Sequence, residues 1–129
     1  MKDIEDTVKQ VKAVRSWSGV LVITVVMEGN KMSCGNNCYY CPDESKKNGA
    51  QVDQPRSYLS NEPAVARANR HKFDAADQVK ARLQMLCNNG HTLSKLEIIV
   101  LGGTFSHYPR KYQEEFIRDI FYAANTFDA

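Results

Sequence analysis

The feature that most constrains the fold of this chain is an almost unbroken apolar run from Gly19 to Met27, rich in β-branched residues. Thr24 is its one polar side chain. The run is too short to cross a membrane and has the length of a strand. A strand without polar alternation is typically covered on both faces, as in a parallel sheet flanked by helices. The sequence therefore predicts an α/β fold with a strand here that is buried on both sides.

A second strand is expected over Leu96–Leu101, ending at Gly102-Gly103. Apolar residues at helical spacing also predict a short amphipathic helix over residues 3–14. Strands that alternate with helices and are themselves buried indicate βαβ units and a parallel sheet. Because only two βα units are visible, the sequence predicts part of a barrel or of an open sheet.

Three further helices are expected. The first starts near Asn61, a candidate N-cap before Pro63. The second starts near Asp74 and stops at Asn88-Asn89-Gly90. Pro109 fits the first turn of the last helix. The predicted core positions are Val79, Leu83 and Leu86 in the second helix, and Tyr112, Phe116, Ile120 and Phe121 in the last.

Length and composition narrow the class of protein. The 129 residues, 43% of them hydrophobic, suit one domain with a core of its own. A net charge of +2 is too small to indicate nucleic acid by itself. The chain has no apolar stretch of membrane-spanning length, and no secretory leader is expected from its first residues. We therefore expect a cytoplasmic protein without a membrane partner.

Three of the four cysteines are crowded into a C-x3-C-x2-C spacing directly after the first strand: Cys34, Cys38 and Cys41. In a reducing compartment such crowding indicates metal or redox chemistry instead of disulfides. Three thiolates on one loop can hold a cubane iron–sulfur cluster and leave its fourth iron open. The alternative is zinc, with Cys87 or a histidine as fourth ligand. Cys87, however, lies among apolar residues of an expected helix, where an inert core thiol is common.

Small residues also follow the second strand, as Gly102-Gly103-Thr104. Alone, two glycines indicate a tight turn. In parallel α/β sheets, however, ligands bind outside the carboxyl ends of the strands. Both strands deliver their unusual residues to that edge, so we expect a ligand site there.

The cysteine loop resembles the hallmark of the radical S-adenosylmethionine (radical SAM) superfamily, C-x3-C-x-aromatic-C, with Tyr40 as the aromatic residue. The resemblance implies that Cys34, Cys38 and Cys41 hold a 4Fe–4S cluster. S-adenosylmethionine would chelate the open iron, with Tyr40 against its adenine and Gly102-Gly103 at its methionine amino group. The usual third member of the Gly-Gly motif is glutamate, where this chain has Thr104.

A longer series of motifs, from about Arg15 to the end of the chain, resembles one subfamily. It is the radical SAM domain of the catalytic third subunit of Elongator and its single-chain relatives, in which Gly-Gly-Thr is the normal form. The resemblance divides the chain into an N-terminal helix and connector (1–18) and the N-terminal part of a radical SAM domain (19–129). The matching runs include Ser18-Gly19-Val20, Gln54-Pro55-Arg56-Ser57-Tyr58, Glu62-Pro63, Arg67-Ala68, Phe73-Asp74, Gln78-Val79, Gly90-His91, Lys95-Leu96-Glu97, Leu101 to Phe105, Tyr112-Gln113 and Phe116-Ile117.

This resemblance implies modification of tRNA. The family builds a carboxymethyl group on carbon five of the wobble uridine, using a 5′-deoxyadenosyl radical and an acetyl group from acetyl-CoA. Acetyl-CoA binds a separate acetyltransferase-like domain. Lys95 matches a lysine implicated in the family's active site. The implied partners are tRNA and either other Elongator-like subunits or a complementary chain carrying the rest of the barrel.

The departures from the family lead to two alternatives. Cys41 is followed by Pro42-Asp43-Glu44 where the family commonly has Pro-Gly-Gly. We also expect most of the barrel and the acetyltransferase-like domain to be missing. We therefore expect the chain alone to be inactive. The alternatives are a non-catalytic module that contacts tRNA or a partner, and a zinc-stabilised domain. Basic side chains can add a tRNA-facing surface, although a solvated helix face is the commoner state: Arg67, Arg70, Lys72, Lys80 and Arg82.

Overall fold

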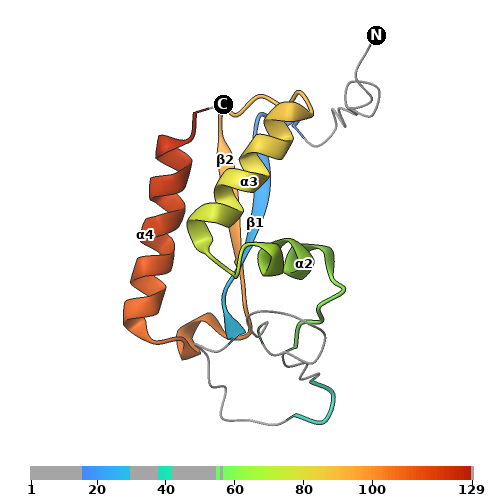
Figure 1. Cartoon of the computed structure of the whole chain (residues 1–129), viewed down its shortest axis with the longest axis vertical. Coiled ribbons are helices and arrows are strands. Elements are labelled where there is room, and N and C mark those ends of the chain that lie inside the picture. Colours follow the sequence, from blue (N-terminus) through green and yellow to red (C-terminus); the bar gives the residue numbers. More distant parts are fainter. Residues whose placement is uncertain (1–15, 30–37, 42–54, 56, 129) are drawn as a thin grey trace.

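A computed structural model describes residues 16–29, 38–41, 55 and 57–128 (Figure 1). The helix expected over residues 3–14 lies outside these residues. None of the helices in the described ranges is long and apolar enough to span a membrane. The elements are β1 (Leu21–Val26), α2 (Pro63–Arg70), α3 (Ala75–Asn88), β2 (Leu96–Leu101), the 3-10 turn η4 (Phe105–His107) and α4 (Arg110–Thr126).

The two strands form a parallel sheet. Leu21 lies opposite Leu96, and Val26 lies opposite Leu101. The prediction of an α/β fold with parallel strands is therefore confirmed. Since parallel strands end at the same edge, the segments that follow β1 and β2 both begin at one end of the sheet.

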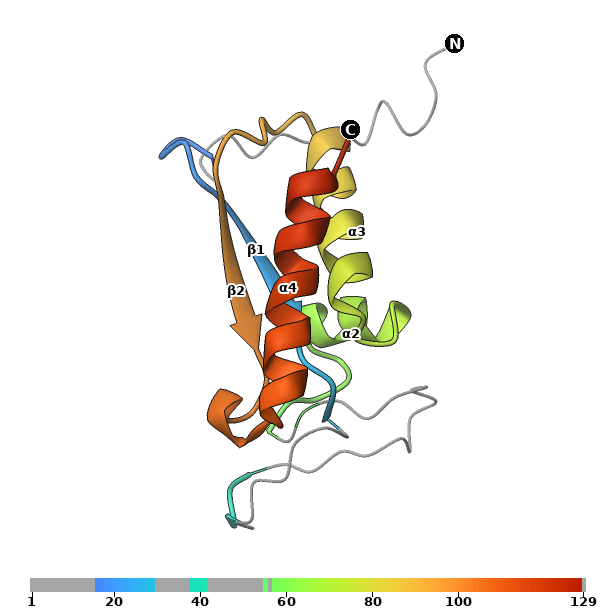
Figure 2. The same ribbon diagram turned by 90° about the vertical axis from the view of Figure 1, so that its left-hand side faces the viewer.

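One face of the sheet is covered by α3 and α4, which lie side by side against it (Figure 2). Leu21, Ile23 and Val25 point to this face and are 3%, 1% and 1% exposed. Full burial of each such side chain contributes about 1.5–3 kcal/mol. This face therefore holds the main core, which also includes Val79, Leu83, Leu86, Phe116, Ile120 and Ala123.

Among the described residues, the opposite face is covered only at its carboxyl end. There Val26 packs in a second cluster with Val65 and Ala68 of α2. Away from that end, Val22 is 45% exposed and Ile99 40% exposed. The prediction that the first strand is buried on both sides is therefore wrong at Val22, in the part of the chain that the structure describes.

Local signals explain where the helices begin and end. The helix α3 begins at Ala75, as expected near Asp74, and the carboxylate of Asp74 caps it by accepting a hydrogen bond from the backbone N–H of Asp77 (2.9 Å). The helix ends at Asn88 with Asn89 as its C-cap, within the predicted stop Asn88-Asn89-Gly90. The predicted cap of α2 is wrong by one residue, because the N-cap is Glu62 and the helix begins at Pro63.

The core stripe of α4 differs from the prediction at one position. Phe116 and Ile120 are buried as expected, and Tyr112 is half-buried. Phe121, however, is 63% exposed, and Ala123 is buried instead. Consecutive helix positions differ by about 100°, so Phe121 is turned away from the stripe that Ile120 continues.

Candidate cofactor site at the carboxyl ends of the strands

Two of the three predicted metal ligands lie within the described residues. Cys38 and Cys41 are joined by a turn in which the N–H of Cys41 donates to the carbonyl of Cys38 (3.0 Å). Cys38 is exposed and Cys41 is half-buried, and neither forms a disulfide. Both views place this short segment beyond the carboxyl ends of β1 and β2 (Figures 1 and 2). Cys34 lies outside the described residues.

The thiols of Cys38 and Cys41 are chemically suited to bind an iron–sulfur cluster. Two thiols one turn apart, with no disulfide between them, suit cysteine ligation of iron. Among the described residues, no three His, Cys, Asp or Glu side chains group as metal ligands. The three-cysteine site therefore stays a prediction that includes Cys34.

Cys87 lies at the other end of the molecule. It is in the last turn of α3, whose carboxyl end lies beside the amino ends of the strands (Figure 1). Fourteen helical residues separate the ends of α3 by about 20 Å. A zinc site that joins Cys87 to the Cys38–Cys41 turn is therefore not formed by this arrangement.

Gly102, directly after β2, has a packing role of its own. A Cβ atom at this position would lie 2.9 Å from the Oη of Tyr108 and 3.0 Å from the Cβ of Met27. A side chain at this position would therefore require Tyr108 or Met27 to shift. Gly103 and Thr104 follow at the same strand end and are exposed. Contact of these residues with a methionine amino group stays a prediction.

Tyr40, the predicted adenine neighbour, is 87% exposed, and Tyr39 beside it is fully exposed. No core contact therefore holds either ring. Stacking of Tyr40 on an adenine also stays a prediction.

Two tyrosines support this strand end, Tyr108 between η4 and α4 and Tyr112 in the first turn of α4. The rings of Tyr108 and Tyr112 are stacked with centroids 5.4 Å apart. The Tyr112 hydroxyl accepts a hydrogen bond from the N–H of Glu28 (3.0 Å), just after β1. Burial raises the pKa of Tyr112 to about 12. The pair therefore ties α4 to the segments that follow both strands, a role that the sequence pattern did not reveal for Tyr108.

The hydroxyl of Tyr108 is the unusual group of this pair. It is buried and has no hydrogen-bond partner among the described residues. Burial first, then the neighbouring Tyr112 and Tyr58, raise the pKa of Tyr108 well above its usual value. The phenol is therefore held neutral against Gly102, as a neutral donor at the strand end.

In the described ranges β1 pairs with β2 alone, which leaves its other edge open, and Gln78 of α3 closes this edge at its carboxyl end. Its side chain accepts from the N–H of Val26 and donates to the carbonyl of Val26, each at 2.9 Å. The amide thus satisfies both groups of one edge residue, as a neighbouring strand would. The sequence analysis included Gln78 only in the run Gln78-Val79 and did not predict this contact. A polar residue directly beside the core position Val79 was the available signal for it.

Lys95, the predicted catalytic residue, lies at the amino end of β2. Its carbonyl accepts from the N–H of Leu21 (2.8 Å), and its side chain is exposed. The length of a six-residue strand, about 20 Å, separates it from Gly102. The structure therefore does not bring Lys95 together with the cysteine turn and the Gly-Gly motif, and its role stays a prediction.

Comparison with known proteins shows which proteins this chain resembles. No protein-family model matches the chain. The chain is 38% identical over 118 residues to the tRNA uridine(34) acetyltransferase of Methanocaldococcus jannaschii, an alignment of 92% of this chain and 21% of that protein. It is 33% identical over 121 residues to Elongator complex protein 3 of Saccharomyces cerevisiae, with 91% and 21% aligned. It is 34% identical over 113 residues to Elongator complex protein 3 of Homo sapiens, an alignment of 84% of this chain and 20% of that protein. The chain thus spans about a fifth of the length of these relatives.

Proposed function

Since the chain belongs to the family of Elongator complex protein 3 and the tRNA uridine(34) acetyltransferases, we propose that it takes part in modifying the wobble uridine of tRNA. The observation that carries this proposal is the identity of 33–38% over about nine-tenths of the chain. The names of the relatives give the substrate and the class of enzyme, a transferase that acts on tRNA. Other Elongator-like subunits, or a chain that supplies the remaining barrel, are the proposed protein partners.

We assign the chain the cofactor part of that activity. Cys34, Cys38 and Cys41 are the proposed ligands of a 4Fe–4S cluster, which with S-adenosylmethionine supplies radical chemistry when bound. The exposed Cys38–Cys41 turn beyond the carboxyl ends of the strands supports this assignment, because ligands of parallel α/β sheets bind at that edge. Acetyl-CoA is the proposed co-substrate of the whole enzyme.

The residues around the strand ends have separate proposed tasks. Gly102 and Gly103 let the backbone approach the amino group of S-adenosylmethionine, beside Thr104. The exposed ring of Tyr40 offers a stacking surface for its adenine. Tyr108 and Tyr112 hold the segments after β1 and β2 in position, through the stacked rings and the hydrogen bond to Glu28.

Anaerobic reconstitution with iron and sulfide tests the cluster. We expect about four irons per chain, absorption typical of a 4Fe–4S cluster, and loss of both in Cys38→Ser and Cys41→Ser. Cys87→Ser is the matched control, because it removes a thiol at the far end of α3 and should load as the wild type does.

Other results would replace the proposal. Stoichiometric zinc without iron uptake would favour a zinc-stabilised domain. By contrast, loading of iron without release of 5′-deoxyadenosine from S-adenosylmethionine under strong reductant would agree with the expectation that the chain alone is inactive, and would leave the cluster assignment in place. Binding of tRNA with no metal at all would favour the non-catalytic module.

A further inference from the structure

A pocket of about 190 Å³ lies where α2 and α3 meet the open edge of β1. Its lining includes Arg67 and Arg70 of α2 and Arg82 of α3, and we call it the arginine pocket. Its volume corresponds to about six water molecules in the liquid, which is enough for a phosphate group. The pocket lies beside Thr24 within β1, and no residue of the Cys38–Cys41 turn lines it, so it is separate from the candidate cofactor site.

Two of the charges in the arginine pocket are not compensated by the described part of the protein. Arg67 and Arg70 lie one turn apart on the same side of α2. Neither forms an ion pair with a carboxylate of the described residues, in contrast to Arg110 and Arg118 of α4. Burial and the positive charge of Arg70 lower the pKa of Arg67. Two like charges held together in this way cost free energy, which a bound anion would offset.

The open edge of β1 adds a backbone donor to the same place. The N–H groups of Leu21 and Met27 donate toward β2, so the N–H groups of the alternate residues point to the other edge. On that edge Val26 is bound by the amide of Gln78. The next residue along it is Thr24, which lines the arginine pocket. Guanidinium groups together with a backbone N–H are the donors that phosphate oxygens accept from in protein–nucleic acid complexes.

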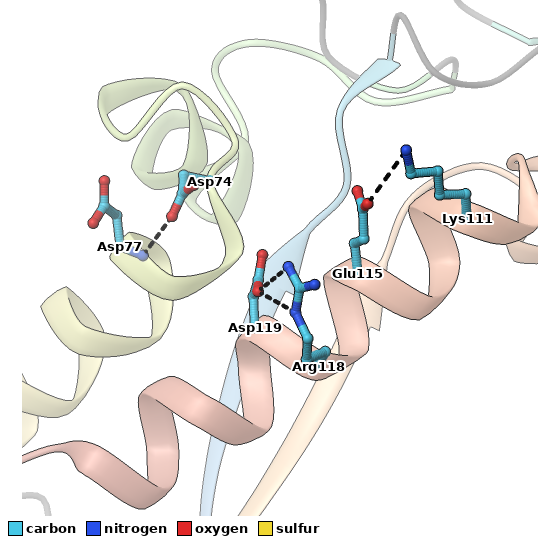
Figure 3. A network of polar contacts seen from close by, with 6 residues as sticks. All are labelled: Asp74, Asp77, Lys111, Glu115, Arg118 and Asp119. Atoms are coloured by element: carbon cyan, nitrogen blue, oxygen red, sulfur yellow. Dashed lines mark hydrogen bonds and ion pairs between the residues drawn. The ribbon is translucent and has the colours of Figure 1, made fainter.

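The other side of α3 carries more carboxylates than cations. Four carboxylates gather between the start of α3 and α4, those of Asp74, Asp77, Glu115 and Asp119 (Figure 3). Lys111 is bound to Glu115 at 3.9 Å and Arg118 to Asp119 at 2.9 Å, and Lys72 lines the same hollow. A polyanion is repelled from this side of α3 and attracted to the side of the arginine pocket.

We infer that the arginine pocket binds a backbone phosphate of tRNA. The inference rests on the proposed function for the identity of the nucleic acid. A phosphate held by Arg67 and Arg70 fixes where the RNA crosses the open edge of β1. Such a contact positions the RNA without reading its sequence.

The experiment compares two double variants of the full chain that change the net charge equally. Arg67→Gln/Arg70→Gln removes the uncompensated pair, whereas Arg110→Gln/Arg118→Gln removes two exposed arginines that are paired with carboxylates on α4. Affinity for an unmodified tRNA transcript is measured by fluorescence anisotropy at several salt concentrations. Thermal unfolding followed by circular dichroism checks that both variants fold.

We expect the pocket variant to bind about tenfold more weakly, the size of one lost charge-assisted hydrogen bond. The slope of log affinity against log salt should fall by about 1. The control variant should bind within about twofold of the wild type. Equal losses in both variants, no loss in the pocket variant, or a wild type that leaves tRNA unbound would each overturn the inference.

A second measurement separates tRNA from a small anion. Inorganic phosphate is titrated into chain labelled with ¹⁵N at arginine, and the side-chain N–H signals of Arg67 and Arg70 are followed. Phosphate-induced shifts together with unchanged tRNA affinity in the pocket variant would make this a small-anion site and overturn the inference. Shifts together with weakened tRNA binding support it.

The inference and the proposed function fail in different ways. If the cluster does not assemble but tRNA affinity depends on Arg67 and Arg70, the radical chemistry is wrong and the pocket stands. If the cluster assembles and yields 5′-deoxyadenosine while both double variants bind tRNA like the wild type, the pocket is wrong and the chemistry stands.

Discussion

On one face of the sheet, Ile23 of β1 lies under α3 and α4 with 1% of its surface exposed, whereas its neighbour Val22 on the other face is 45% exposed. Both are β-branched side chains of one strand, so strand propensity does not distinguish them. What differs is the cover: two helices on one face, and a cluster around α2 at the carboxyl end of the other. The comparison separates residues that stabilise the chain from residues that it leaves available for contact.

The largest effect is expected on the covered face. Ile23→Ala should lower the free energy of unfolding by about 2–5 kcal/mol, because it leaves a cavity beneath α3 and α4. Urea unfolding followed by circular dichroism measures the change. A loss below about 1 kcal/mol would mean that the two helices do not pack on this face as described.

The next largest effect is expected where the covered face meets the strand ends. Gly102→Ala places a Cβ 2.9 Å from the Tyr108 Oη and should cost about 1–3 kcal/mol from overpacking. Tyr108→Phe removes that oxygen, so Gly102→Ala should cost less when it is combined with Tyr108→Phe. A double-mutant cycle of unfolding free energies measures the coupling. An equal cost with and without the Tyr108 hydroxyl would assign the constraint to Met27 instead.

Tyr112 gives a smaller effect with a defined pH window. Its pKa is raised by burial from 10 to about 12, so its contribution to stability is fully present below pH 10 and is lost as the pH rises through 12. Tyr112→Phe also removes the acceptor of the Glu28 N–H and should cost about 1 kcal/mol at neutral pH. Between about pH 8 and pH 12 the free energy of unfolding should fall less steeply in the variant than in the wild type. An identical fall in both proteins would contradict the raised pKa of Tyr112.

The sequence predicts well what local patterns determine. The apolar runs predicted both strands, and the expected start near Asp74 with the spacing of Val79, Leu83 and Leu86 predicted α3. An apolar run cannot tell which of its faces is covered, so the exposure of Val22 was not predicted. The amide of Gln78 on Val26 joins residues 52 positions apart, and no local pattern encodes such a contact.

The same distinction applies to the candidate site. The spacing of Cys34, Cys38 and Cys41 is local and was visible in the sequence. The packing of Tyr108 against Gly102 depends on where α4 begins after η4, because that start decides which side chain faces the strand end. Lys95 is far from the cysteine turn because it precedes β2, whereas Gly102 follows it, and a match to a motif does not by itself take account of the length of the strand between them.

The smallest effect, and the sharpest check of the comparison, is expected on the open face. Val22→Thr keeps the β-branched shape and adds a hydroxyl, which a half-exposed site can hydrate. In the chain as described, the unfolding free energy should change by less than about 0.5 kcal/mol. A desolvated hydroxyl without a partner costs about 1–3 kcal/mol, so a loss in that range would mean that the middle of this face is covered in solution. The two outcomes for Val22→Thr, a change below about 0.5 kcal/mol or a loss of about 1–3 kcal/mol, differ by more than the error of urea unfolding. The measurement therefore shows directly whether the two faces of the sheet differ in how well they are covered.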